Sequence, residues 1–182
     1  MIAIVIESAK KGKREENHIK RILGLKIKEN KIYLDNKNRE IIFYKMGGQG
    51  ELLKIENYKA IVQKTKTLFF ILDADKNYYE VEKKTKKLIS DLKKYGVIAD
   101  YFISCNPETK KGKIESLLLS CLKSDTLKIC YSNFLECIGK NGLDKYDEKG
   151  ILQKLFEIDD PPYDVECEFF KPLKDKFYNL GE

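Results

Sequence analysis

The sequence has a single histidine, His18, and its five cysteines form no Cys-x-x-Cys pair. Because zinc sites are built from closely spaced cysteine and histidine ligands, these shortages argue against a zinc protein. Two of the cysteines, Cys121 and Cys137, stand in apolar helical patterns and are expected to be reduced core residues. Reduced cysteines of this kind are typical of a cytoplasmic protein, which is the location we expect.

Long apolar runs are missing as well. No run approaches the roughly 18 residues that a membrane span needs, so we expect no membrane partner. The apolar opening, Ile2–Ile6, reaches Glu7 at once and lacks the basic start and small-residue cleavage site of a signal peptide. It is therefore predicted to be the first strand. The chain has no Gly/Ser-rich linker, internal repeat or low-complexity tract.

The composition is that of a globular protein with mixed charge. The 182 residues, 42% of them hydrophobic, suffice for one domain with a hydrophobic core but are too few for two domains of ordinary size. The net charge of +6, from 35 basic and 29 acidic side chains, permits contact with a polyanion without demanding it. The simpler explanation of the many lysines is an AT-rich genome.

Apolar runs alternate with helical patterns along the first 124 residues. Strands are predicted at residues 2–6, 41–44, 68–72 and 97–103, with a weaker one between residues 26 and 39 that ends in a turn at 35–38. Helices are predicted at residues 15–23, 52–61, 79–95 and 114–122. This alternation predicts an α/β fold, Rossmann-like and in three layers, with a mainly parallel central sheet flanked by helices.

Beyond residue 124 the pattern becomes helical. Two helical stretches are predicted at residues 126–139 and 145–158, followed by Asp159-Asp160-Pro161-Pro162 and an aromatic tail. We therefore divide the chain into an α/β core at residues 1–124 and a helical C-terminal annex at residues 125–182 that packs on the same domain.

Acidic residues stand at the predicted ends of separate apolar strands. Asp73 and Asp75 follow the most apolar strand, and Glu7 ends the first one. Ligands of open α/β sheets bind beyond the carboxyl ends of the strands, and side chains two positions apart in extended backbone can point to the same side. Glu115 is a further candidate, in the first turn of a predicted helix. Since convergent carboxylates repel one another unless cations neutralise them, this pattern predicts a Mg²⁺ or Mn²⁺ site.

Each of these acids also has an ordinary structural explanation. Aspartate suits turns and helix caps, so Asp75 is as good a cap for the following helix as a metal ligand. Glu115 could merely complement the macrodipole of its helix. The occurrence of acids at the ends of two separate strands favours the metal site over these explanations.

Several residues near the predicted acidic edge could contact phosphate. These candidates are Lys10, Lys11, Lys13, Lys76, Gly47 and Gly48. Lysines neutralise phosphodiesters, and glycines let the backbone approach a phosphate closely. Ordinary surface lysines and a plain tight turn are the simpler interpretations. His18 lies on the first helix and is not expected to act as a base.

These motifs resemble the Toprim fold of topoisomerases, primases and OLD-type nucleases. That fold has a glutamate after a first apolar strand and Asp-x-Asp after a later one, here Val5-Ile6-Glu7 and Ile71-Leu72-Asp73-Ala74-Asp75. The chain looks closest to a small stand-alone Toprim-like family related to OLD-type nucleases. The further matching motifs, within Met1 to Leu122, are Glu15-Glu16, Gly47-Gly48 and the segment from Pro107 through Gly112 to Glu115-Ser116-Leu117-Leu118.

The resemblance implies a Toprim-like core and Mg²⁺- or Mn²⁺-dependent phosphoryl transfer, above all a nuclease acting on DNA or RNA. It implies catalytic roles for Glu7, Asp73 and Asp75, with Glu7 as metal ligand or as general acid or base. The implied metal ligands are Glu7, Asp73, Asp75, Glu115 and either Glu15 or Glu16. The alternative is a non-catalytic module that binds a nucleotide or nucleic acid, or that partners a separate ATPase.

Overall fold

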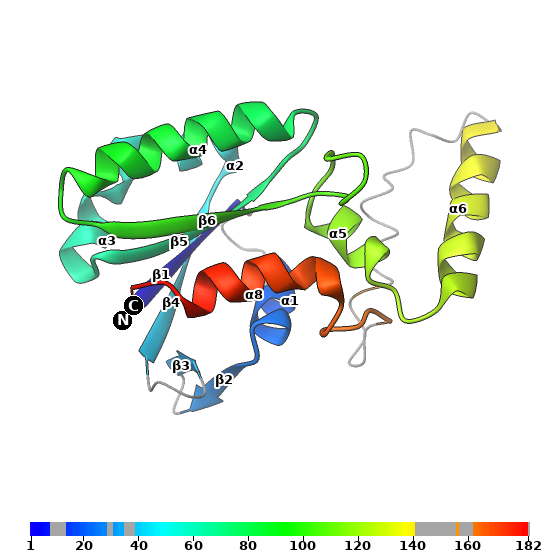
Figure 1. Ribbon diagram of the computed structural model, residues 1–182, viewed down its shortest axis with the longest axis horizontal. Coiled ribbons are helices and arrows are strands. Elements are labelled where there is room, and N and C mark those ends of the chain that lie inside the picture. The colour runs from blue at the N-terminus through cyan, green and yellow to red at the C-terminus, as the bar shows by residue number, and fades with distance from the viewer. Residues whose placement is uncertain (8–13, 29–30, 35–38, 141–155, 157–161, 182) are drawn as a thin grey trace.

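The apolar runs form one six-stranded sheet in the computed structural model, which describes residues 1–7, 14–28, 31–34, 39–140, 156 and 162–181 (Figure 1). The strands are β1 (Ile2–Glu7), β2 (Leu25–Lys28), β3 (Lys31–Leu34), β4 (Arg39–Met46), β5 (Thr67–Asp73) and β6 (Ile98–Ser104). Their order across the sheet is β2-β3-β4-β1-β5-β6.

Four of the six strands run parallel. β1 pairs in parallel with β4 and β5, and β5 pairs in parallel with β6. The weakly predicted segment between residues 26 and 39 forms two strands, β2 and β3, which add to β4 in antiparallel pairing. The predicted α/β fold with a mainly parallel sheet is confirmed, with an antiparallel edge. The turn predicted at 35–38 lies outside the described residues.

Helices cover both faces of the sheet (Figure 1). They are α1 (Arg14–Ile22), α2 (Gly48–Leu52), η1 (Ile55–Tyr58), α3 (Lys59–Lys64), α4 (Tyr78–Lys93), α5 (Ile114–Ser120), α6 (Asp125–Lys140), η2 (Glu168–Phe170) and α8 (Lys171–Tyr178). Residues of α1, α5 and α8 share one core cluster, while residues of α2, η1, α3 and α4 share the other. The sheet is therefore the middle layer of three.

The central strands bury alternate side chains in the two clusters. In β5, Phe69 and Ile71 belong to the first cluster and Phe70 and Leu72 to the second. This follows from the two-residue period of a strand, and burial on both faces explains why the run is apolar throughout. Phe69 packs edge-to-face on Phe177 of α8, with ring centroids 5.3 Å apart. The C-terminal helix thus completes the first layer.

The helix predicted continuously over residues 52–61 is instead three short pieces, α2, η1 and α3. The hydroxyl of Tyr58 donates to the backbone carbonyl of Leu52, an acceptor that a continuous helix would need for its own ladder. Both residues are buried, at 1% and 0% exposure, in the same core cluster. The break allows both side chains to reach the sheet.

The C-terminal region returns to the sheet. The helix predicted at 126–139 is α6, whereas the stretch predicted at 145–158 lies outside the described residues except for Phe156. Periodicity did not predict α8, whose residues Leu173 and Phe177 are buried. The division of the chain at residue 124 stays a prediction. No helix in the described ranges is long and apolar enough to span a membrane.

Two of the cysteines differ from the sequence expectation. Cys121 forms a disulfide with Cys167, their Cα atoms 5.6 Å apart, so its predicted reduced state is wrong. Cys137 is exposed and does not lie in the core. The pairing occurs because the C-terminal segment returns to the end of α5, where the Asp164 amide donates to the Cys121 carbonyl at 2.8 Å.

Candidate metal and phosphate site

The carboxyl ends of the four parallel strands form one edge of the sheet. Glu7, the last residue of β1, is paired with Met46, the last residue of β4. Asp73, the last residue of β5, is paired with Ser104, the last residue of β6. The pairing register therefore brings two of the predicted acids, Glu7 and Asp73, to neighbouring positions on this edge.

Hydrogen bonds attach the start of α5 to the end of β5. The amide of Ile114 donates to the Asp73 carboxylate at 3.1 Å. Asp75 and Gly112 exchange two backbone hydrogen bonds, of 2.8 and 2.7 Å. Glu115 follows Ile114 directly and is only 8% exposed. The third predicted acid is thus held beside the first two, although some forty residues of sequence lie between.

The loop before α5 has a backbone that depends on particular residues. Asn106 closes its first turn, because its side-chain oxygen accepts from the amides of Glu108 and Thr109 at 2.9 and 3.0 Å. Gly112 has φ +96°, and a Cβ atom there would collide with the side chain of Ser116. Only glycine fits both constraints without strain. This loop sets where Glu115 lies.

The electrostatics of the cluster are dominated by Asp73. Burial raises the pKa of its carboxyl well above the usual range, and the charges of Glu7 and Glu115 raise it further, while Lys113 and a backbone hydrogen bond oppose them. For Lys113, partial burial lowers the pKa, but the hydrogen bond to Asp75 and the charges of Asp73, Asp75 and Glu7 raise it overall. Ionising Asp73 here is costly, so a cation would be favoured at this position.

Asp75 does not extend the strand as the sequence suggested. Its φ of +48° is left-handed, so the expectation that Asp73 and Asp75 project from extended backbone is wrong. The Asp75 carboxylate instead pairs with the Lys113 ammonium at 3.2 Å. Nor is Asp75 the cap of α4, because Asn77 holds that position and accepts from the amide of Glu80 at 3.2 Å.

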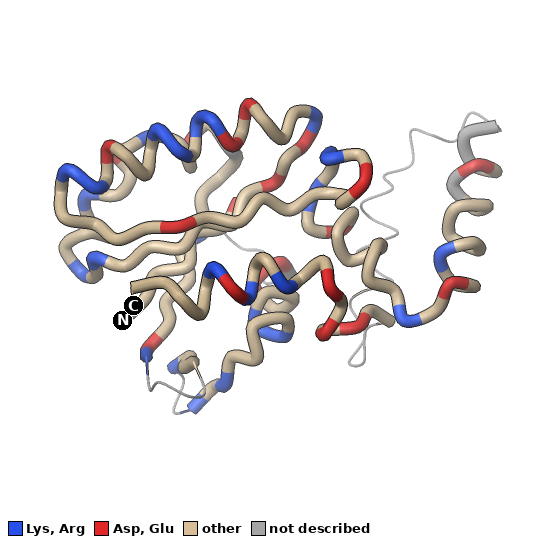
Figure 2. The backbone as a smooth tube through the Cα atoms, viewed as in Figure 1, with Lys and Arg blue, Asp and Glu red and all other residues tan. Residues whose placement is uncertain are grey.

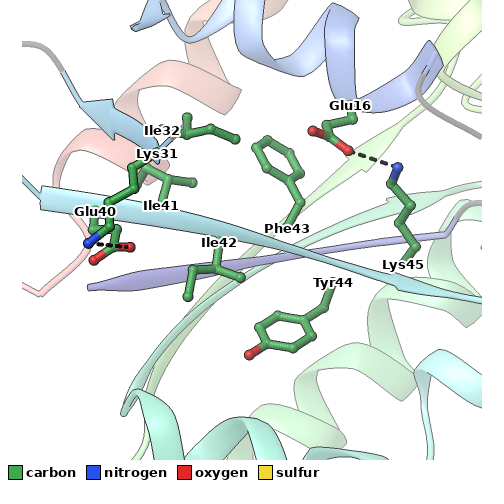
Figure 3. A pocket seen from close by; sticks show the side chains of 9 residues that line it. All are labelled: Glu16, Lys31, Ile32, Glu40, Ile41, Ile42, Phe43, Tyr44 and Lys45. Carbon is green, nitrogen blue, oxygen red and sulfur yellow. Dashed lines mark ion pairs between the residues drawn. The ribbon is translucent and has the colours of Figure 1, made fainter. Parts of the chain in front are cut away.

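Glu16 belongs to a different charge network. One of its oxygens lies 2.5 Å from the Lys20 ammonium. The other lies 2.8 Å from the ammonium of Lys45, the pair drawn in Figure 3. Burial alone would raise the pKa of Glu16, but both lysines lower it overall. Together with residues of β4 it lines an open pocket of about 540 Å³. Both oxygens are therefore engaged by lysines, which suits Glu16 poorly to the metal role predicted for it.

The basic candidates are only partly described. Lys10, Lys11 and Lys13 lie outside the described residues. Lys76 is exposed, and with Asp75 and Lys113 it lines a pocket of about 520 Å³ at the N-terminus of α4. Two ammonium groups and a helix N-terminus are features that favour an anion, but the carboxylates of Asp75 and Glu80 line the same pocket and offset them.

The glycine turn also lies at this edge. Gly47 and Gly48 directly follow β4, whose last residue pairs with Glu7. Gly48 has φ +74°, a conformation that favours glycine. A Cβ atom at either position would meet no atom within 4 Å. The structure thus explains Gly48 by its backbone conformation and leaves phosphate contact as a prediction.

Sequence reasoning missed two polar residues of the edge. Lys113 was not considered, although the Gly-Lys-Ile-Glu run that ends at Glu115 contains it. Ser104 is fully buried opposite Asp73, and its hydroxyl has no hydrogen-bond partner among the described residues. Nothing in an apolar strand pattern would have indicated Ser104.

In the part of the chain that the structure describes, no group of three or more His, Cys, Asp or Glu side chains is arranged as a ready metal site. Mg²⁺ does not require one, because it usually takes one or two protein carboxylates and completes its shell with water and phosphate. Asp73 with Glu7 or Glu115 would supply these one or two carboxylates. The negative charges of Glu7 and Glu115 beside Asp73 also suit a divalent cation.

Comparison with known proteins finds no matching family model, and no curated protein or solved structure matches the chain either.

Proposed function

We propose that the protein is a Mg²⁺-dependent phosphoryl-transfer enzyme, a Toprim-like nuclease that cleaves DNA or RNA, with its metal held by Asp73, Glu7 and Glu115. The observation that carries this proposal is the hydrogen bond from the Ile114 amide to Asp73, which sets Glu115 beside the ends of two parallel strands. When bound, Mg²⁺ supplies polarisation of a phosphoryl oxygen and lowers the pKa of a bound water.

The proposal is supported by the loss of folding stability that the acidic cluster causes when no cation is bound. Buried like charges destabilise a fold unless they serve a ligand, and perturbed carboxyls in such places are typical of functional sites. The pKa of Asp73 is raised by burial and by the charges of Glu7 and Glu115. Its ionised form therefore costs stability at neutral pH, which a divalent cation would restore.

The chain's own residues have distinct roles in this proposal. Lys113 and Lys76 line the pocket beside the acids and offset the charge of a substrate phosphate. Asp75 positions Lys113 through their 3.2 Å ion pair. Glu7, at the end of β1, either completes the set of metal ligands or, instead of that role, exchanges a proton with the attacking water or the leaving oxygen.

Metal binding is tested first, by thermal unfolding with and without Mg²⁺ or Mn²⁺. A cation present at 100 times its Kd stabilises by about 2.7 kcal/mol, a rise in Tm of roughly 5 to 10 °C for a chain of this size. Asp73→Asn should abolish that rise and should also melt higher than the wild type without metal, because it removes an unfavourable charge. Glu16→Gln is the matched control and should keep the rise. An equal rise in Asp73→Asn would refute the site.

Catalysis is tested separately, on single- and double-stranded DNA and RNA with Mg²⁺ or Mn²⁺. We expect cleavage that is lost in Asp73→Asn and reduced about 10² to 10⁴-fold in Glu7→Gln, the range of a general acid or base. Asp91→Asn, on the exposed face of α4, should cleave normally. Cleavage that survives Asp73→Asn with Asp75→Asn would rule out this assignment.

One observation favours a second candidate, a non-catalytic module that binds a nucleotide or nucleic acid or partners a separate ATPase. Lys113 lies 3.2 Å from Asp75 and its charge lowers the pKa of Asp73, so the cluster has a partial counter-charge of its own. Calorimetric titration separates the two candidates. Mn²⁺ binding that depends on Asp73, without cleavage of any of these substrates, supports the binding module.

A further inference from the structure

A second pocket, of about 370 Å³, lies where η1, α3 and the end of α4 meet. Figure 1 shows α3 and the end of α4 at the same end of the sheet, away from α5. Lys66 lines the pocket and immediately precedes β5, whose last residue is Asp73. Seven strand residues at about 3.3 Å each place the two sites roughly 20 Å apart. The pocket is therefore separate from the acidic cluster.

The floor of the pocket is rigid and apolar. Tyr58 is 1% exposed, packs edge-to-face on Phe70 with centroids 5.4 Å apart, and donates its hydroxyl to the Leu52 carbonyl. Leu92 of α4 is also only 1% exposed, and Val62 of α3 adds a branched side chain to the lining. Because these side chains are held by the core, the hollow does not depend on a mobile loop.

The rim of the pocket is aromatic and basic. The ring of Tyr95 is 64% exposed, and its backbone carbonyl accepts from the Lys66 ammonium at 3.3 Å. Lys59 also lines the pocket, and no carboxylate does so. Within the described residues, neither lysine forms an ion pair. Two positive charges therefore lie beside an apolar hollow whose lining residues include no carboxylate.

The neighbouring helix α4 is also rich in lysine. Lysines cluster in its middle, between acidic residues near its two ends (Figure 2). Their ion pairs are Lys84–Glu80, Lys86–Glu82 and Lys94–Asp91. Other lysines of α4, such as Lys83 and Lys87, form no ion pair among the described residues either. Lys59 and Lys66 differ from them in lining an apolar hollow without a carboxylate, and this position indicates a ligand with the opposite charge.

We propose that this pocket binds a small organic anion, a carboxylate with an aromatic or branched aliphatic body. The body would fill the space between Tyr58, Val62 and Leu92, with Tyr95 covering it, while the carboxylate faces Lys59 and Lys66. The volume is within the range of small-molecule sites, and an apolar hollow with a few polar groups is their usual composition. A nucleic-acid chain does not fit a hollow of this size. The proposal is independent of the chemistry at the acidic cluster.

The test is a nuclear magnetic resonance titration of the full chain with 2-naphthoate and with its neutral counterpart, 2-naphthalenemethanol. We expect 2-naphthoate to shift backbone amide signals of η1, α3 and the end of α4, with saturation below millimolar concentration. The alcohol should bind about tenfold more weakly, because it lacks the charge-assisted contact. The double variant Lys59→Gln with Lys66→Gln should bind 2-naphthoate more weakly by a similar factor. Lys64 is an exposed lysine of α3 outside the pocket, so Lys64→Gln is the matched control and should leave the affinity for 2-naphthoate unchanged.

Val62→Trp tests the cavity itself. Filling the hollow should abolish binding of both compounds while the far-ultraviolet circular dichroism spectrum stays that of the wild type. If this variant does not fold, Tyr95→Ala, which alters only an exposed ring, should still weaken binding. Equal affinity for acid and alcohol, no shifts at the pocket up to millimolar concentration, or an equal loss in Lys64→Gln would each overturn the proposal.

Discussion

Protonation of His18 should make the fold sensitive to mild acid. The ring lies on α1 among aromatic side chains, and its Nδ1 atom is 2.9 Å from the Tyr163 hydroxyl. Burial lowers its pKa from 6.5 to about 4; the charge of Arg21 lowers it too, and that of Glu15 partly offsets both. His18 is therefore neutral in the folded protein at pH 7.

The sign of the effect follows from proton linkage. Between about pH 6.5 and pH 4 the unfolded chain binds a proton at this residue more readily than the folded chain does. Stability therefore falls as the pH falls through this window. At about 1.4 kcal/mol for each unit of pKa, the loss is about 2 kcal/mol at pH 5 and about 3 kcal/mol near pH 4, where it levels off.

Urea unfolding at pH 7.5, 6 and 5 measures this loss, with His18→Gln as the comparison. Glutamine can still bond to Tyr163 but does not titrate. Asp73 acts in the opposite direction, since its raised pKa favours the folded state as the pH falls. The difference between the two proteins cancels that contribution. We expect the advantage of the wild type to shrink by about 2 kcal/mol from pH 7.5 to pH 5. A constant difference would refute the half-buried, neutral state of His18.

Two further predictions concern the scaffold of the site. Gly112→Ala should lower the free energy of unfolding by about 1 to 2 kcal/mol or more, because of its φ of +96° and the collision with a neighbouring side chain, whereas Gly47→Ala should be nearly neutral in the same denaturant titration. Cys121→Ser with Cys167→Ser should cost about 2 to 4 kcal/mol, since the disulfide closes a long loop. Cys130→Ser, at an exposed free thiol, should change stability little.

Local pattern was enough to predict the frame of the molecule. Apolar runs such as Ile2–Ile6 and Leu68–Leu72 become central strands because burial on both faces requires apolar side chains at every position. The same runs end at Glu7 and Asp73, and parallel pairing puts strand ends on one edge. That both acids lie at this edge therefore follows from hydrophobicity and chain direction, whereas their being neighbours follows from the pairing of β1 with β5.

The partners of those acids depended on contacts between distant residues. The bridge between Asp75 and Gly112 and the left-handed turn at Asp75 direct that carboxylate to Lys113, which no local period could reveal. Glu16 was bound by lysines of α1 and β4 for the same reason. The disulfide of Cys121 needed the return of the C-terminal segment. Hydrophobic period is a local property of the chain, whereas the pairing of charges and thiols is set by the packing of whole elements.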